Sequence, residues 1–342
     1  MRFVSRAVIT LALPISASAQ SLDLMVHNTG LSIGDSRVVH GVRLNFRDSR
    51  MREVDGINAT IWSPYDLPRG RVRGISLGLP VTGASEIRGI GVGAFGIGAA
   101  HDFTGLGIGG LGIGAGGDVS GILVGGLGVG SGGSVTGLTI GGLGAGTGGS
   151  LRGITIGGLG AGAGGSVTGF QLGGLGVGSG GRVTGISIGG LGVGAGGEVT
   201  GLQIGGIGVG AGSDVTGVSL ALVGVGSGGT VRGLAMSGVG VGAPRIRGIV
   251  ISALAAGGHD VFAGVIAPAY FKIESDNDGD DMGEFRGVSL SAYNHIKGSQ
   301  RGLTLGLINT AWELRGYQIG LLNYAANNPR GLRLLPLFNK RW

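Results

Sequence analysis

The stretch SVTGLTIGGLGAGTGG, residues 134–149, carries seven glycines in sixteen residues and no charged side chain, and near-copies of it lie on both sides. Of the 342 residues in the chain, 84 are glycine, 42% are hydrophobic and only 13% are charged. Disorder is typical of low hydrophobicity and high charge, so this composition predicts a folded chain. Collagen is excluded because glycine falls mostly at every second position and Pro totals only 8.

The repeat is marked by the glycine of a V-x-G triplet, which we call the anchor glycine. Anchors recur every sixteen residues from Gly89 to Gly264, with one step of fifteen, and the series extends less regularly from Gly41 to Gly331. An antiparallel hairpin series tends to repeat every second strand, whereas here every unit is equivalent to the next. The period therefore predicts parallel stacking of the units.

The first half of each unit alternates between apolar and polar residues. In the quoted unit, Val135, Leu138 and Ile140 are apolar, and Thr139 stands between the last two. Side chains alternate between the two faces of a strand, so we expect Val135, Leu138 and Ile140 on one buried face. The column of Thr, Ser and Gln residues that contains Thr139 is then expected on the exterior.

After Gly141-Gly142 the alternation resumes one residue out of phase. A phase slip at a glycine pair predicts a corner followed by a second short strand. Leu143 and Ala145 are expected to face inward on that strand. The glycines between and after them, Gly144 and Gly146, then leave its outer face without side chains.

These features predict an all-β fold, a parallel β-solenoid of Gly-rich coils with about sixteen residues each. Roughly 19 coils at about 4.8 Å each make a rod on the order of 90 Å long. The alternative is an outer-membrane antiparallel β-barrel, which strands of about ten residues and the terminal Trp342 favour. The barrel is disfavoured because the apolar face switches sides within each unit and the central repeats lack aromatic girdles.

The first nineteen residues predict a secretory signal peptide. Arg2 and Arg6 precede an apolar stretch that is too short to span a membrane, and Ala17-Ser18-Ala19 forms a cleavage site. We therefore expect export to the cell surface, outer membrane or periplasm of a Gram-negative-type bacterium. The chain has no Cys, so its stability comes from backbone ladders and apolar packing rather than disulfides.

The mature chain divides into three segments by composition. Residues 20–69 are more charged and aromatic and are expected to form capping coils, residues 70–265 hold the regular repeat, and residues 266–342 hold C-terminal repeats with an acidic insertion at 274–284. In the last segment Asn occupies one repeat position. Stacked amides form hydrogen-bonded ladders, so we expect such a ladder there. Its members are Asn294, Asn309 and Asn323.

The units RGLTLGLINTA and LRGYQIGLLNYA, within about residues 300–342, resemble the LxGxQIGLxNxA repeats of bacterial exported surface-repeat proteins first noticed in spirochaetes. In the middle of the chain only the period is similar, because glycine replaces the polar and bulky positions. The resemblance implies an exported, surface-exposed or outer-membrane-associated protein. It implies no catalytic residues.

The acidic insertion ESDNDGDDMGE is a candidate calcium loop. Its first, third and fifth residues are acidic and the sixth is Gly279, as in loops where alternating oxygens surround a hard cation. The twelfth position is Phe285, so another carboxylate would have to close the site. The alternative is a solvated surface loop. The candidate ligands are Glu274, Asp276, Asp278, Asp280 and Glu284.

Arginine often stands immediately before the anchor glycine, and on stacked coils these arginines would form a positive stripe for sulfate, phosphate or carboxylate groups. The alternative is that they cap turn carbonyls and keep an edge soluble. The candidate anion-binding residues are Arg286, Arg301, Arg315 and Arg330. The net charge of +6 suits anionic glycans or lipid head groups and is too small to indicate nucleic acid.

Catalytic patterns are weak. Gly144, Gly146 and Gly149 spell GxGxxG, but the motif recurs in repeat after repeat without a helix pattern after it. The five histidines share no repeat position and no nearby nucleophile or acid pattern. We therefore expect a non-enzymatic structural or adhesive protein without a cofactor, calcium excepted. It would bind a glycan, lipopolysaccharide or another surface protein through the bare glycine face or the Arg stripe. The alternatives are an outer-membrane β-barrel or pore protein, with membrane association, and a calcium-dependent binding module.

Overall fold

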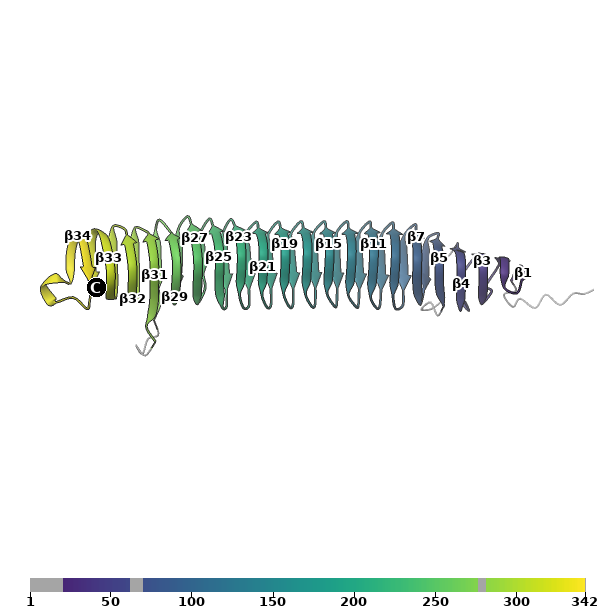
Figure 1. Ribbon diagram of the computed structural model, residues 1–342. Helices are drawn as coiled ribbons and strands as arrows, with labels where there is room; N and C mark the ends of the chain where they lie inside the picture. Colours follow the sequence, from purple (N-terminus) through teal and green to yellow (C-terminus); the bar gives the residue numbers. More distant parts are fainter. Residues whose placement is uncertain (1–20, 62–69, 276–280, 342) are drawn as a thin grey trace, which may run out of the picture.

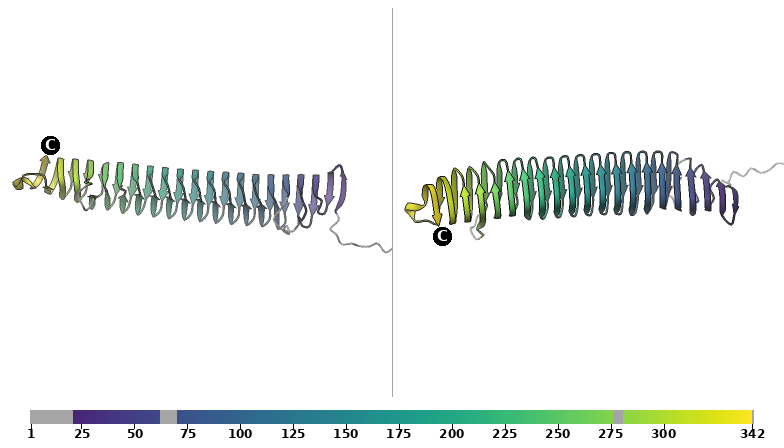
Figure 2. Two further views of the ribbon diagram at one scale, coloured as in Figure 1. Left: turned by 90° about the horizontal axis from the view of Figure 1, so that it is seen from below. Right: turned by 45° about the horizontal axis from the view of Figure 1, so that its top comes forward.

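The structure is a computed structural model that describes residues 21–61, 70–275 and 281–341. The predicted signal peptide lies outside these residues. The described chain forms an elongated rod of parallel β-coils stacked along one axis (Figures 1 and 2). It makes about 17 turns at a spacing of about sixteen residues. The predicted solenoid is therefore confirmed with slightly fewer turns than expected, and the barrel alternative is wrong.

From β5 (Arg71–Gly78) to β30 (Tyr270–Ile273) each coil contributes one long and one short strand, and each strand pairs with its equivalents in the neighbouring coils. β13 (Val135–Gly141) lies between β11 (Val119–Gly125) and β15 (Leu151–Gly157) in a parallel ladder. The other long strands of this sheet are β2 (Thr29–Ile33), β3 (Val38–Asn45), β4 (Glu53–Thr60), β5 (Arg71–Gly78), β7 (Glu86–Gly93), β9 (Phe103–Gly109), β17 (Val167–Gly173), β19 (Val183–Gly189), β21 (Val199–Gly205), β23 (Val215–Ala221), β25 (Thr230–Ser237), β27 (Arg245–Ser252), β29 (Asp260–Ile266) and β31 (Gly283–Leu290).

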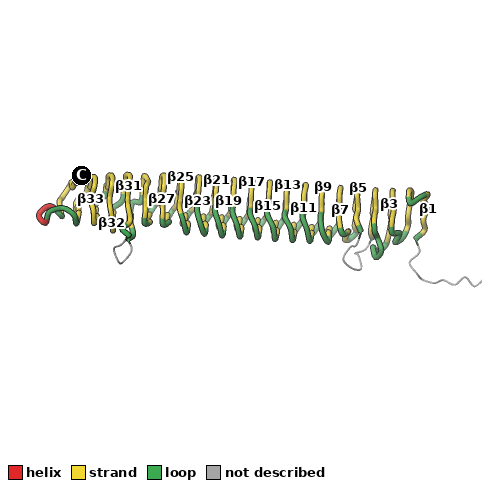
Figure 3. Tube along the Cα trace, turned by 60° about the horizontal axis from the view of Figure 1, so that its bottom comes forward, coloured by secondary structure: helices red, strands yellow, loops and turns green. Residues whose placement is uncertain are grey.

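The short strands form a second parallel ladder, in which β14 (Gly144–Thr147) lies between β12 (Gly128–Ser131) and β16 (Gly160–Ala163). Turns connect the two ladders along the edges of the rod (Figure 3). The other short strands are β6 (Val81–Ala84), β8 (Gly96–Ala99), β10 (Gly112–Ala115), β18 (Gly176–Ser179), β20 (Gly192–Ala195), β22 (Gly208–Ala211), β24 (Gly224–Ser227), β26 (Gly240–Gly242), β28 (Ala255–Gly258) and β30 (Tyr270–Ile273).

The two ends of the rod are closed by antiparallel strands. At the N-terminal end β1 (Leu22–Val26) runs antiparallel to β2, whereas β2, β3 and β4 already belong to the parallel ladder. At the C-terminal end β32 (Tyr293–Leu305) and β33 (Ile308–Ala325) extend the stack, and β34 (Leu334–Arg341) pairs antiparallel with β33 after the short 3-10 helix η1 (Arg330–Leu332). Solenoids need such covered ends, because an open ladder pairs with other chains.

In each long strand the side chains that follow the anchor face the opposite way from the prediction, whereas Val135 on the long strand and Ala145 on the short strand are buried as expected. Val135, Thr139 and Ala145 fill the interior at 2%, 1% and 4% exposure, while the column that contains Leu138 faces out, with Ile154 in it 46% exposed. β13 continues unbroken through its anchor glycine, so residues two before and two after the anchor share a face. The prediction placed Val135 and Leu138 on one face, which an unbroken strand does not allow.

The column of Thr, Ser and Gln is therefore internal rather than external. Its hydrogen bonds link neighbouring coils: the Ser187 hydroxyl donates to Oε1 of Gln171 at 3.2 Å, and Nε2 of Gln203 donates to the carbonyl of Gly185 at 3.3 Å. The same internal position also accepts apolar side chains, since Leu123 lies in register with Thr139 and is fully buried. The members, each at most 1% exposed, are Thr139, Thr155, Gln171, Ser187, Gln203 and Ser219.

Anchor and corner glycines are required by the backbone. Gly137 has φ +124°, a region that L side chains rarely adopt, and a Cβ there would overlap the carbonyl oxygen of Gly121 in the preceding coil. At the corner, a Cβ on Gly142 would overlap the oxygen of Gly126 in the same way. The predicted corner is confirmed, although Leu143 lies in the turn and is half exposed rather than buried.

The interior of the first coils is ionic. Arg43 is fully buried, donates to the Asp35 carboxylate at 2.7 Å and to Oδ1 of Asn58 at 2.8 Å, and also contacts Asp48. Burial opposes ionisation of Asp35, but hydrogen bonds from Ser49 and the charge of Arg43 hold its pKa below the ordinary value. These groups cover the apolar core at its N-terminal end.

Amides fill part of the interior at the C-terminal end, where Asn294 stacks on Phe271 of β30. Nδ2 of Asn294 donates to Oδ1 of Asn309 at 2.7 Å, and Nδ2 of Asn309 donates to Oδ1 of Asn323 at 2.7 Å. All three side chains are fully buried. The structure thus contains the asparagine ladder that the sequence predicts.

Candidate functional site

The outer face of the short-strand ladder is almost bare, as predicted from Gly144 and Gly146. We call this surface the glycine face and define it by the glycines nine residues after each anchor. Their φ angles are not in the positive region, and a Cβ on any of them would meet no atom closer than 3.6 Å. They are Gly98, Gly114, Gly130, Gly146, Gly162, Gly178, Gly194, Gly210, Gly226 and Gly242.

Folding does not require glycine at these ten positions. Glycine loses more conformational freedom than any other residue when it is fixed in a strand, and it adds no side-chain packing. A β-branched residue with the same backbone would favour the strand by up to about 1 kcal/mol. Ten consecutive coils nevertheless carry glycine there. A function that needs close approach to the backbone accounts for this pattern.

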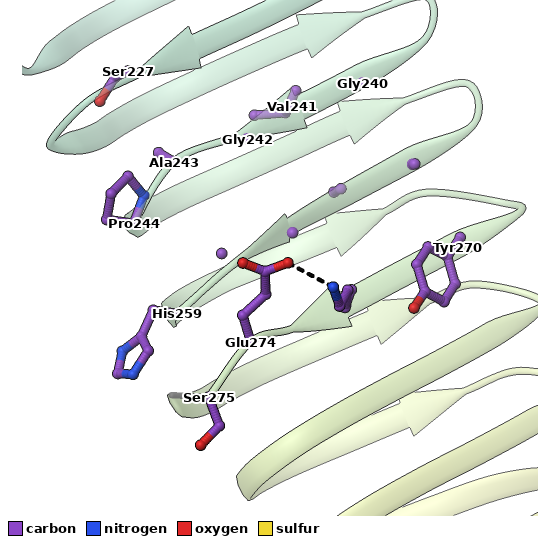
Figure 4. A pocket seen from close by; sticks show the side chains of 15 residues that line it. Ser227, Gly240, Val241, Gly242, Ala243, Pro244, His259, Tyr270, Glu274 and Ser275 are labelled. Atoms are coloured by element: carbon purple, nitrogen blue, oxygen red, sulfur yellow. Dashed lines mark hydrogen bonds and ion pairs between the residues drawn. The ribbon is translucent and has the colours of Figure 1, made fainter. Parts of the chain in front are cut away.

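The glycine face ends at a step formed by β30. Tyr270 and Lys272 occupy the positions that hold Gly240 and Gly242 two coils earlier, since β26 pairs with β28 and β28 pairs with β30. The step borders a hollow of about 760 Å³, floored by the last glycines and walled by Tyr270, Lys272 and Glu274 (Figure 4). We call this hollow the Tyr270 shelf.

Hydrogen bonds hold the wall of the shelf in place. The Tyr270 hydroxyl lies 3.1 Å from Nδ1 of His295, and the Tyr293 ring stacks on the His295 ring with centroids 5.3 Å apart. Burial raises the pKa of Tyr270. Burial also lowers the pKa of His295, and the charges of Lys297 and Lys272 lower it further. His295 is therefore neutral at pH 7 and pairs with the Tyr270 hydroxyl without a charge.

An ion pair completes the wall. Nζ of Lys272 donates to Oε1 of Glu274 at 2.6 Å, and this bond raises the pKa of Lys272 and lowers the pKa of Glu274. Glu274 is 63% exposed, so the pair is accessible from the shelf. The shelf thus offers aromatic rings, a cation and an anion beside a flat floor.

A second unusual surface covers the outer face of the long-strand ladder and the adjoining edge. We call it the apolar belt and define it by three apolar columns, which lie one, three and six residues after the anchors. The first column is Ile90, Leu106, Ile122, Leu138, Ile154, Phe170, Ile186, Leu202, Val218, Leu234 and Ile249. The second is Val92, Ile108, Val124, Ile140, Ile156, Leu172, Ile188, Ile204, Leu220, Met236 and Ile251. The third is Phe95, Leu111, Leu127, Leu143, Leu159, Leu175, Leu191, Ile207, Val223, Val239 and Leu254.

Charges lie on the opposite edge and on the first outward position of the long strands beside it. We call this edge the wide-turn edge because turns such as Gly148-Gly149-Ser150 lie there. Every Asp, Glu, Lys and Arg between residues 86 and 247 stands one or three residues before an anchor, at or beside this edge. They are Glu86, Arg88, Asp102, Asp118, Arg152, Arg182, Glu198, Asp214, Arg232, Arg245 and Arg247. The cross-section of the rod is therefore amphipathic.

The candidate anion stripe is partly present and largely neutralised by ion pairs. Arg286, Arg301 and Arg315 lie in register on successive strands, but Arg330 lies in η1, outside the stripe. Arg286 and Arg301 both bind Glu284, at 2.8 and 2.9 Å, and Arg315 binds Glu313 at 2.6 Å. Two predicted anchor positions are also wrong. Ala263 rather than Gly264 aligns with Gly248, and Gly331 lies in η1 rather than in a strand.

Three of the candidate calcium ligands, Asp276, Asp278 and Asp280, lie outside the described residues. The other two form ion pairs, Glu274 with Lys272 and Glu284 with Arg286 and Arg301. Within the part of the chain that the structure describes, no three His, Cys, Asp or Glu side chains are placed to hold a metal ion.

Comparisons with family models, curated proteins and solved structures found no match to the chain. The resemblance to exported surface-repeat proteins therefore remains a prediction. None of the helices in the described ranges has the length and hydrophobicity to cross a membrane.

Sequence reasoning missed the Tyr270 shelf and the apolar belt. The signal for the shelf was the replacement of two glycine columns by Tyr270 and Lys272. The signal for the belt was the four-residue distance between Val135 and Thr139, which places both on one face of an unbroken strand.

Proposed function

We propose that the protein is a non-enzymatic, exported structural and adhesive rod whose glycine face holds an extended glycan chain. The observation that carries the proposal is the run of ten outward glycines that folding does not require. A partner that lies against a flat backbone needs the absence of side chains along its whole path. A substrate in an enzyme cleft needs no such length.

The Tyr270 shelf favours a glycan as this partner. A sugar ring has an apolar face that packs on flat surfaces and aromatic rings, and a rim of hydroxyl groups that needs polar partners. The glycine face offers the flat surface, Tyr270 offers a ring, and Lys272 and Glu274 offer a donor and an acceptor at the end of the path. The ten glycines lie on successive, equally spaced strands, and such a surface suits a polymer with a repeating unit.

Export is supported by the predicted signal peptide and by the resemblance to surface-repeat proteins. Cell fractionation with protease treatment of intact cells tests this part. We expect the mature chain in the envelope fraction. Recovery of the uncleaved chain from the cytoplasm would contradict export and leave the glycan proposal to be tested on its own.

The glycan proposal is tested with the variant Gly146→Thr/Gly178→Thr. Both side chains point into open space, so we expect the fold to be retained and the melting temperature to be unchanged or higher. Cosedimentation with peptidoglycan sacculi and with cellulose measures binding. We expect the wild-type protein to bind at least one of the two polymers, and the variant to bind it at least tenfold more weakly.

The matched control is Ser150→Thr/Ser166→Thr, which creates the same side chain on the wide-turn edge and should bind like the wild-type protein. The variant Tyr270→Ala tests the shelf and should weaken binding in the same assay. If the wild-type protein binds neither polymer, the proposal that its partner is a glycan is wrong. A Gly146→Thr/Gly178→Thr variant that binds normally would overturn the role of the glycine face.

A further inference from the structure

We infer that the apolar belt lies on a lipid bilayer, with the wide-turn edge of the rod directed into water. This surface is separate from the glycine face, and the inference does not depend on glycan binding. It rests on the size of the belt, on the distribution of charge around the rod and on the shape of the belt.

The belt is too large to be an ordinary surface. Eleven coils at about 4.8 Å, with a width of about 15 Å, give on the order of 800 Å² of continuous apolar surface. The largest apolar patch on a typical soluble monomer is about 300–600 Å², and larger patches mark contact with protein or membrane. Within the belt, Ile122, Leu143 and Ile154 are 46%, 50% and 46% exposed. The belt needs a partner along its whole length.

The charge distribution orients the rod at an interface. In the regular coils no charged residue interrupts the belt, and all of the charges stand one or three residues before an anchor. Interfacial amphipathic helices show the same separation of an apolar face from a charged face, and they lie in the membrane plane with the apolar side buried. The rod reproduces this pattern with β-coils.

Basic groups border the belt on its long side. Arg152, Arg232 and Arg247 lie on the outer face of the long-strand ladder, two residues from the first belt column. A guanidinium group beside an apolar surface binds lipid phosphates at a membrane interface. Arg232 also pairs with Asp214 at 3.7 Å, and the Arg247 guanidinium lies 5.9 Å from the centroid of the Phe262 ring. The belt also contains a hollow of about 660 Å³ lined by Leu220, Met236 and Ile266 among others, which fluid acyl chains can fill.

The shape of the belt distinguishes a bilayer from a second copy of the rod. Two of its columns lie on the face of the ladder, but the column that contains Leu143 lies on the edge, where Leu159 and Leu191 are 49% and 50% exposed. Two rigid rods packed face to face would leave this edge column in water. A fluid bilayer surrounds a convex edge and covers all three columns.

The test uses the variant Leu143→Glu/Leu159→Glu/Leu175→Glu. These side chains point outward, so the β-sheet circular dichroism spectrum should be retained. The matched control is Ser134→Glu/Ser150→Glu/Ser166→Glu, with the same change in charge at the position where Asp118, Glu198 and Asp214 stand naturally. Binding is measured by cosedimentation with vesicles of pure phosphatidylcholine and of phosphatidylcholine with phosphatidylglycerol.

We expect the wild-type protein to bind both vesicles, and the anionic ones more tightly. The leucine variant should bind vesicles of pure phosphatidylcholine at least tenfold more weakly than the wild-type protein. The serine control should bind these vesicles like the wild-type protein. A wild-type protein that stays in the supernatant would overturn the inference. So would a wild-type dimer in sedimentation velocity that the leucine variant dissociates while neither protein binds vesicles, because a second copy would then cover the belt. Equal loss in both variants would also overturn it.

Discussion

Gly137 on the long-strand ladder and Gly146 on the short-strand ladder belong to one coil and recur with the same period, yet they serve different purposes. Gly137 has a left-handed φ angle and lies against the backbone of the preceding coil, so no side chain fits. Gly146 has open space above it, because a Cβ added there would lie 3.9 Å from its nearest neighbour. Equal repetition along the chain therefore does not imply an equal structural requirement.

The largest expected effect comes from breaking the anchor. Gly137→Ala places a methyl group against the Gly121 carbonyl in an unfavourable φ region, so we expect a loss of about 3 kcal/mol or more in the free energy of unfolding. Gly146→Ala should change it by less than about 0.5 kcal/mol. Urea unfolding followed by circular dichroism measures both. Equal destabilisation would mean that the short-strand glycines are also required for folding.

A smaller effect is expected from the asparagine ladder, and here the contrast is between the buried amides of the C-terminal coils and the exposed outer face of the middle coils. Asn309→Ala removes the donor to the buried Oδ1 of Asn323 and one of the three acceptors of Nδ2 of Asn294, so we expect a loss of about 1–3 kcal/mol in the free energy of unfolding. The exposed Thr136→Ala on the outer face is the control. Thermal unfolding monitored by circular dichroism checks the order of the two effects, and a control that is as destabilised as Asn309→Ala would contradict it.

The smallest expected effect is a change of stability with pH. It arises at the Tyr270 shelf, which contains titratable groups, and not at the uncharged glycine face beside it. The pKa of His295 is lower in the folded protein than its ordinary value of 6.5, so the unfolded chain binds the proton more readily. Stability is therefore fully present above that value and declines as the pH falls towards the folded pKa. Melting temperatures at about pH 7.5 and about pH 5 measure the decline. His295→Gln should reduce it, and an unchanged decline would assign it to other groups.

Much of the rod was predictable because the order of glycine, apolar and polar residues repeats along the sequence. A sixteen-residue period of equivalent units leads to parallel stacking, a glycine pair out of phase leads to a corner, and a column of Asn at one repeat position leads to a buried ladder. The bare outer face of the short strands was predictable for the same reason. Each of these conclusions needs only the order of residues along one coil and the identity of neighbouring coils.

By contrast, the sequence did not show which side chains face the interior of the rod and which face its exterior, because this depends on how the coils pack. Whether Leu138 or Thr139 is buried depends on the strand staying continuous through Gly137, which the stacking of that strand between its neighbours in adjacent coils decides. The shelf at Tyr270 likewise exists only because β30 stacks beside β28, fifteen residues earlier. Residue order along one repeat was enough to specify the coil. The path of the backbone through the anchor glycine, and the stacking of neighbouring coils, decided which side chains form its surfaces.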